Sequence, residues 1–177
     1  TFPGGPFDTN ETITEYSITD KEVLRASEVR TTAHDGTVLI EKTKFVNDYD
    51  IASSATDAAS KALYDLKGLH LIALPVEEAS FILDGSTEKL LGATLHFYDR
   101  LDVGQAAPKF KSNRQTNLEG PLSGYQMSRT TNPSGSGTFL YDSQYFTDDL
   151  LSVTKQNAFH EAIQGENENL DVISYIL

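Results

Sequence analysis

Hydrophobic positions beyond residue 68 fall in short runs separated by turn residues. The runs cover residues 69–74, 79–83, 91–98, 122–130, 138–146, 150–154, 158–163 and 170–176. Turn-forming residues separate them, as in Asp84-Gly85-Ser86, Glu119-Gly120-Pro121 and the stretch 132–137. Short strands at such spacing are typical of antiparallel architectures. The pattern therefore predicts a mainly β fold, either an antiparallel β-barrel or a β-sandwich.

A hairpin is expected near the N-terminus. Residues 29–33 and 37–40 are rich in β-formers and flank Asp35-Gly36, a strong signal for a tight turn between two strands. The second run continues through residues 43–46. Thr19 and Glu22 match a capping box, so a short helix over 21–30 is an alternative lead-in to this hairpin.

One helix is predicted, over residues 55–67. The stretch Ser54–Asp57 supplies an N-terminal cap and an acidic residue in the first turn. Apolar residues then recur at helical spacing. They are Ala58, Ala59, Ala62, Leu63 and Leu66. Gly68 stands where a helix often ends in a left-handed residue.

The remaining chain divides into an arm and one domain. Residues 1–10 hold two of the six prolines and two glycines, so they predict an N-terminal arm. Residues 11–177 are expected to form a single β-rich domain. Residues 170–177 are strongly β-prone and end apolar, so this strand must pair within the domain or with a neighbouring chain.

Charge and composition narrow the partners. The chain of 177 residues has 14 basic and 26 acidic residues, for a net charge of −12. Such a charge repels phosphate backbones and anionic lipid surfaces, so nucleic acid is not expected as a partner. No apolar run approaches the roughly 18 residues of a membrane helix, so no membrane span is expected.

Cysteine is absent, which excludes disulfide scaffolds, thiol nucleophiles and thiolate metal sites. Asn10-Glu11-Thr12 is a glycosylation sequon, and the chain starts at Thr1. Together they favour a protein that is secreted or resides in an organelle lumen.

The densest polar chemistry lies in residues 96–102. On a strand, His96, Tyr98 and Arg100 share one face, and Asp99 points to the other. An imidazole, a phenol and a guanidinium on one face can bind and polarise an oxygenated ligand. The alternative, which these residue types favour, is an outer sheet face with cross-strand charge pairs.

Late aromatic residues are candidates for lining a ligand site. Tyr125 and Met127 have the same parity, as do Phe139 and Tyr141. Tyr125 and Tyr141 are therefore candidate ligand-binding residues together with His96, although paired aromatic residues more often form core.

Metal and cofactor motifs are not found in the sequence. His96, Asp99 and Asp102 lack a metal-ligand spacing, and residues 47–50 lack the glycine and glutamate of a calcium loop. Phosphate-binding loops and nucleophile elbows are missing too. We therefore expect no metal and no cofactor.

Four pieces of the second half resemble the allene oxide cyclase and dirigent β-barrel families. Residues 92–101 resemble the family strand that ends in an acidic residue and a leucine, and residues 119–125 are similar to the glycine-punctuated strand after it. Residues 150–153 resemble a later short strand. Residues 162–165 stand at the place of an Ile-x-Gly-Gly turn, although Glu166 replaces the second glycine.

This resemblance implies an eight-stranded, cofactor-free barrel whose mouth holds a small hydrophobic substrate. Asp99 and, more loosely, Arg100 are the positions that carry over. In the function that we expect from this reading, Arg100 and Tyr98 stabilise developing oxygen charge and Asp99 acts as an acid or base or as support. Since Asp99 and Arg100 have opposite strand parity, both line one cavity only if a bulge intervenes.

Two functions follow as hypotheses. The first is an exported barrel that binds a small hydrophobic molecule and guides its cyclisation or coupling, with catalytic Asp99, Arg100 and Tyr98. The second is a non-enzymatic extracellular structural subunit, a filament, coat or adhesive protein, which assembles with copies of itself through its arm or edge strands. Whether the chain is an enzyme stays open at this point.

Overall fold

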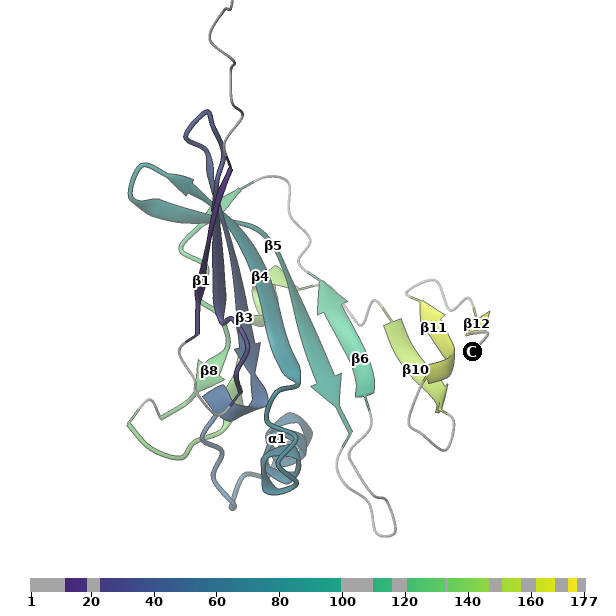
Figure 1. Cartoon of the computed structure of the whole chain (residues 1–177). Helices are drawn as coiled ribbons and strands as arrows, with labels where there is room; N and C mark the ends of the chain where they lie inside the picture. The colour runs from purple at the N-terminus through teal and green to yellow at the C-terminus, as the bar shows by residue number, and fades with distance from the viewer. Residues whose placement is uncertain are drawn as a thin grey trace, which may run out of the picture.

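The structure is a computed structural model of a mainly antiparallel β fold with one α-helix (Figure 1). It describes residues 12–18, 23–99, 110–115, 121–132, 134–146, 151–156, 162–167 and 172–174. The fold class predicted from the hydrophobic pattern is confirmed. The predicted arm at residues 1–10 lies outside the described residues.

Six strands follow one another in chain order across one sheet. They are β1 (Ile13–Ser17), β2 (Glu28–Thr32), β3 (Val38–Phe45), β4 (Pro75–Asp84), β5 (Thr87–Tyr98) and β6 (Phe110–Gln115). Strand β6 pairs at two positions with β10 (Leu151–Gln156), which is followed in the sheet by β11 (Ala162–Asn167) and β12 (Val172–Ser174). Within the described residues the order runs from β1 to β12 without closing, so these strands form an open meander and not a closed barrel.

Two tight turns join the long strands of this meander. Gly36 connects β2 to β3 and Gly85 connects β4 to β5, and both glycines have positive φ. The Asp35 carboxylate accepts a hydrogen bond from the Thr37 amide at 2.9 Å, which fixes the first turn. The predicted Asp-Gly hairpin is confirmed. The predicted lead-in helix over 21–30 is wrong where it is described, because residues 28–30 pair with β3 as a strand.

The helix α1 (Ala58–Gly68) packs Leu63 and Leu66 against the core at the end of β4 and β5. Asp57 is its N-cap and accepts the Ser60 amide at 2.8 Å, whereas the sequence placed the cap from Ser54 onward. The left-handed residue after the helix is His70 and not Gly68. The chain therefore turns at residues 69–70, and the strand predicted at 69–74 does not form.

Replacing Asp57 by alanine should lower the free energy of unfolding by about 1 kcal/mol, because the Ser60 amide loses its acceptor. Urea unfolding followed by circular dichroism measures this change. Ser54→Ala is the matched control and should leave the stability unchanged. Equal losses in both variants would show that Asp57 is not the cap that matters.

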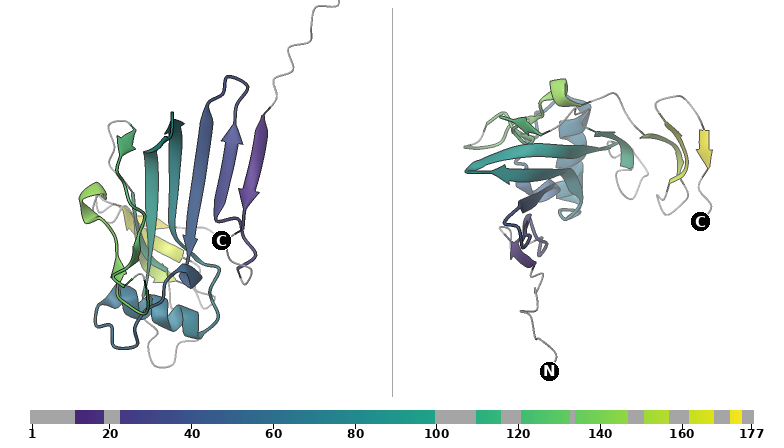
Figure 2. Two further views of the ribbon diagram at one scale, coloured as in Figure 1. Left: turned by 90° about the vertical axis from the view of Figure 1, so that its left-hand side faces the viewer. Right: turned by 90° about the horizontal axis from the view of Figure 1, so that it is seen from above.

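Residues 121–132 and 134–146, here called the covering segment, lie over one face of β4 and β5 (Figure 2). They contain β7 (Leu122–Ser123), β8 (Arg129–Thr130) and β9 (Phe139–Leu140). The strands predicted at 122–130 and 138–146 are too long. Only residues 122–123 pair with β5, residues 129–130 pair with 139–140, and several aromatic side chains between them pack onto the sheet. Phe81, Leu90 and Ala93 pack from the sheet side.

Backbone contacts fix the covering segment to the loop before α1. Gly137 donates to the Asp50 carbonyl at 2.9 Å, and its own carbonyl accepts the Ala52 amide at 2.8 Å. A Cβ atom at Gly137 would lie 2.8 Å from the backbone nitrogen of Asn132, so only glycine fits at this close approach of the two backbone segments. The Phe139 amide also donates to the buried Ser60 hydroxyl on α1, at 2.7 Å.

Candidate functional site

A buried carboxylate, Glu77 on β4, lies between the sheet and the covering segment. Its side chain points to the same face as Ala79 and Phe81 because residues two apart on a strand share a face. Its exposed fraction is 0%. A carboxylate in such a place is strongly destabilising unless donors surround it.

Three donors from the covering segment meet this carboxylate. The Tyr125 hydroxyl donates to Oε1 at 2.5 Å, and the Ser128 amide donates to Oε2 at 2.6 Å. The Ser128 hydroxyl also donates to Oε2. Each of these bonds joins the sheet to the covering segment, so Glu77 fixes the position of residues 125–128.

The network continues to β3 and to the loop after it. The Ser128 hydroxyl uses its one proton on Glu77, so the Tyr49 hydroxyl, 2.6 Å away, donates to the Ser128 oxygen. The Lys44 ammonium donates to the Ser128 carbonyl at 2.7 Å and lies 5.9 Å from the centre of the Tyr49 ring. Lys44 is also the cross-strand neighbour of Glu77. The network thus contains a positive side chain, Lys44, next to a negative one, Glu77, on adjacent strands.

Burial keeps both phenols of this network protonated. The pKa of Tyr49 is raised well above its usual value by burial, and the negative charge of Glu77 adds to this shift. The pKa of Tyr125 is raised by burial first, then by the charge and the hydrogen bond of Glu77. Both hydroxyls therefore remain hydrogen-bond donors throughout the neutral pH range.

The outer side of the covering segment forms an open groove of about 460 Å³. Tyr125 and Met127 point to the sheet, while Gln126 and Arg129 lie on the outer side. The polar and aromatic residues of the groove are Gln126, Arg129, Tyr141, Asp142, Gln144 and Tyr145. The groove is thus built on the backbone that Glu77 holds.

Among the described residues that line this groove, Arg129 supplies the positive charge. Arg129 pairs through its backbone with Leu140, and its side chain is exposed. In the part of the chain that the structure describes, it has no hydrogen-bond or ion-pair partner. Asp142 in the same groove already accepts a hydrogen bond from the Gln144 amide at 3.0 Å. Arg129 therefore keeps its donors available for a ligand.

The groove also has an aromatic wall. The Tyr145 ring contacts the Tyr125 ring at a centroid distance of 5.4 Å, and Tyr141 contacts Phe146 at 5.9 Å. These edge-to-face contacts stabilise the positions of the two rings. Of the two tyrosines predicted to bind a ligand, Tyr141 lines the groove. Tyr125 lies beneath the groove and donates a hydrogen bond to Glu77.

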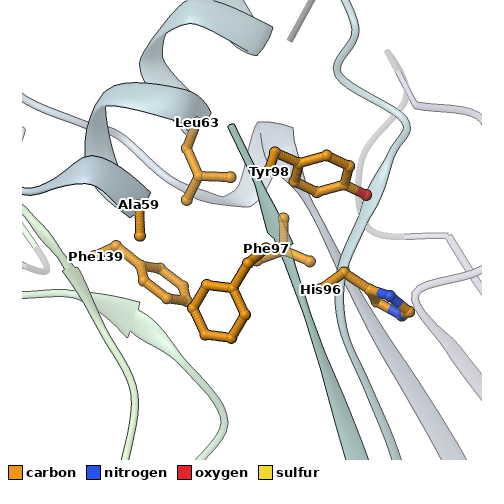
Figure 3. A pocket seen from close by; sticks show the side chains of 7 residues that line it. Ala59, Leu63, His96, Phe97, Tyr98 and Phe139 are labelled. Carbon is orange, nitrogen blue, oxygen red and sulfur yellow. The ribbon is translucent and has the colours of Figure 1, made fainter. Parts of the chain in front are cut away.

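The predicted residues of the 96–102 stretch lie elsewhere. His96 and Tyr98 point to the side of β5 opposite Phe97 (Figure 3). His96 Nε2 lies 2.8 Å from the Glu78 carboxylate, and the Tyr98 hydroxyl donates to the Pro75 carbonyl at 2.7 Å. Asp99 is exposed just after β5, and Arg100 lies outside the described residues.

The cavity beside these residues is small. It lies between α1 and β5 and has a volume of about 10 Å³, the lower limit for one water molecule. Leu63, Phe97 and Phe139 fill the surrounding space (Figure 3). The catalytic roles predicted for Asp99, Arg100 and Tyr98, and the ligand role of His96, remain predictions.

Glu77 and Ser128 were not among the residues expected from the sequence. A signal for Glu77 exists, because it has the same parity as the apolar Ala79 and Phe81 on a strongly β-prone run. Ser128 has no such signal. Its role depends on a pairing across 51 positions that only the fold brings about.

No group of three or more His, Cys, Asp or Glu side chains in the described ranges is placed to hold a metal ion. Among the described helices, none has the length and apolar character needed to cross a bilayer.

Comparisons with protein-family models, with curated proteins and with solved structures found no significant match to this chain. The similarity to allene oxide cyclase and dirigent proteins and the expected secretion therefore remain predictions.

Proposed function

We propose that this chain is a binding protein whose groove on the covering segment takes a small, acidic, hydroxyl-rich molecule, such as a sugar acid. The observation that carries the proposal is the Arg129 guanidinium, which has no partner within the described residues and lies in a groove of about 460 Å³. Grooves of this size match small organic ligands.

Each part of the groove has a role for such a ligand. Arg129 presents a planar set of donors that fits a carboxylate with two parallel hydrogen bonds. The amides of Gln126 and Gln144 offer donors and acceptors for hydroxyl groups. Tyr141 and Tyr145 offer ring surface for the apolar face of a sugar.

This groove suits a polar ligand better than the hydrophobic ligand predicted from the sequence. The groove is lined mainly by polar groups, and the apolar cavity next to β5 is about 10 Å³, too small for an organic molecule. Binding of a polar ligand requires no cavity inside the sheet. We therefore propose a polar, acidic ligand in place of the hydrophobic ligand predicted from the sequence.

Arg129→Gln should weaken the binding of a hexuronate by at least about tenfold, because a charge-assisted pair contributes about 1.5 to 3 kcal/mol. Titration calorimetry with a hexuronate, a hexose phosphate and an uncharged hexose measures the preference. The hexuronate and hexose phosphate arms separate a carboxylate ligand from a phosphate ligand. Arg25→Gln, which removes an exposed arginine outside the groove, should leave the affinity unchanged.

Two results would contradict the proposal. One is equal binding of the uncharged hexose and of both acidic sugars, which would show that Arg129 does not select the ligand. The other is that none of the three probes binds the unaltered protein.

A further inference from the structure

The groove on the covering segment contains a negative side chain as well as a positive one. Arg129 and Asp142 both line it. Arg129 pairs with Leu140 across the short ladder of β8 and β9, and Asp142 follows two residues after Leu140 with an extended backbone (φ −88°, ψ 93°). Diagonal neighbours on paired strands lie about 7 to 8 Å apart. The backbone therefore brings a guanidinium and a carboxylate to neighbouring positions in one groove.

The Asp142 carboxylate has capacity for a further donor. In the described ranges the ion pairs join other side chains, and none joins Asp142 to Arg129. The Asp142 carboxylate accepts the Gln144 side-chain amide through Oδ2 at 3.0 Å. An ionised carboxylate has about four acceptor positions, so Asp142 can accept a charged donor besides this amide.

Further features favour a cation beside Asp142. The rings of Tyr141 and Tyr145 line the same groove, and the faces of such rings attract ammonium groups. The net charge of −12 attracts a positive group over a longer distance. The pKa of Tyr125, beneath the groove, is raised by burial and by Glu77, and the charge of Asp142 adds to this shift. The negative charge of Asp142 therefore lies close to the floor of the groove.

We propose that the ligand of this groove carries an ammonium group in addition to its carboxylate, as an amino sugar acid does. Arg129 binds the carboxylate, and Asp142 binds the ammonium. This inference rests on the proposed function and defines its ligand class more narrowly. A ligand with both charges has no net charge, so its approach is not opposed by the repulsion that a plain sugar acid meets from a chain of charge −12.

The same two residues distinguish among related ligands. A sugar with two acidic groups places one of them against Asp142, which is unfavourable. A plain sugar acid gains the bond to Arg129 but offers Asp142 a neutral hydroxyl. Hydrogen bonds between two charged groups are about twice as strong as neutral ones, so the amino sugar acid should bind most tightly.

Four sugars that share one ring test this order by titration calorimetry at about pH 6, where amines of this kind are protonated. Glucose carries neither charge, glucuronate the carboxylate, glucosamine the ammonium, and glucosaminuronate both. We expect glucosaminuronate to bind at least about tenfold more tightly than glucuronate, because an ammonium replaces a hydroxyl at the same carbon. Glucosamine should exceed glucose by a similar factor.

Substitutions separate the roles of the two residues. Asp142→Asn keeps the size of the side chain and an acceptor for Gln144, and it should remove the advantage that the ammonium gives to glucosaminuronate and to glucosamine. Arg129→Gln should weaken the two sugars that have a carboxylate and leave glucosamine unchanged. Glu41→Gln removes the same charge at an exposed residue on the opposite face of the sheet, and it should leave the order of affinities unchanged.

Equal affinity for glucuronate and glucosaminuronate overturns this inference and leaves the role of Arg129 in place. Equal weakening of all four sugars by Asp142→Asn also overturns it, because that result indicates a structural role for Asp142. So does tighter binding of both acids by Asp142→Asn, because Asp142 then competes with the ligand for Arg129. Failure of the proposed function gives a different result, in which the two acids bind no more tightly than glucose and glucosamine, and the inference then fails with it.

Discussion

Replacing Glu77 by alanine should lower the free energy of unfolding by about 3 to 5 kcal/mol. The substitution leaves the Tyr125 hydroxyl and both donors of Ser128 without their acceptor in a buried place. It also removes the bonds that hold the covering segment on β4. Urea unfolding followed by circular dichroism gives the change, and the proposed binding of a sugar acid should weaken in parallel because the groove loses its support.

Glu78 is the control that the chain itself offers. It is the next residue on β4, its side chain is 54% exposed, and it faces His96 on the opposite side of the sheet. Glu78→Ala should cost less than about 1 kcal/mol, as is usual for an exposed pair. Should Glu77→Ala fail to fold, Glu77→Gln is the milder variant. It keeps the shape of the side chain but replaces one acceptor oxygen by an NH2 donor, which then faces a donor of Tyr125 or Ser128. Equal losses for Glu77→Gln and Glu78→Gln would contradict the role given to Glu77.

Alkaline pH should destabilise the protein steeply above about pH 10. Burial raises the pKa of Tyr49, of Tyr98 and of Tyr125 in the folded state. The stabilising contribution is fully present below the unfolded pKa of about 10 and is lost as the pH rises from there toward the folded values, because only the unfolded chain then releases the proton. The loss is at most about 1.4 kcal/mol per pH unit for each tyrosine, and less for Tyr98 and Tyr125, which are closer to solvent.

Unfolding curves in urea at a series of pH values test this slope. Tyr49→Phe should reduce the slope by about 1.4 kcal/mol per pH unit, since phenylalanine has no proton to release. At neutral pH the same variant should lose about 1 kcal/mol from the missing bond to Ser128. Recovery of the curve after return to neutral pH excludes chemical damage. An unchanged slope in Tyr49→Phe would show that Tyr49 ionises equally in both states.

The parts of the fold that local sequence controls were predictable. The hairpin between β2 and β3 follows from Asp35-Gly36, and the helix follows from apolar spacing over residues 58–66. Its last turn was not predictable, because the left-handed residue is His70, where glycine would be expected. The covering segment was misjudged for a different reason. Its aromatic residues favour strands, but packing on Phe81 and Leu90 outweighs that preference.

The candidate site was predictable only in part. Tyr125 and Tyr141 stand out as late aromatic residues, and the structure places Tyr141 in the groove and Tyr125 beneath it. The pairing of Glu77 with Ser128, which places Arg129 next to this network, depends on contacts between distant positions. Alternation along a strand can mark an inward-facing carboxylate, but it does not identify the donors that will surround it.

The long sequence separation between hydrogen-bonded residues of the sheet and of the covering segment has a consequence for folding during translation. Strands β1 to β5 connect in order, so their pairing needs only residues up to 98. The bonds of Ser128 and Tyr125 to the sheet span 48 to 84 positions and need residues made much later. The meander can therefore assemble on the ribosome while Phe81, Leu90 and Ala93 still face water, and this apolar surface is covered only after residue 146 has left the exit tunnel.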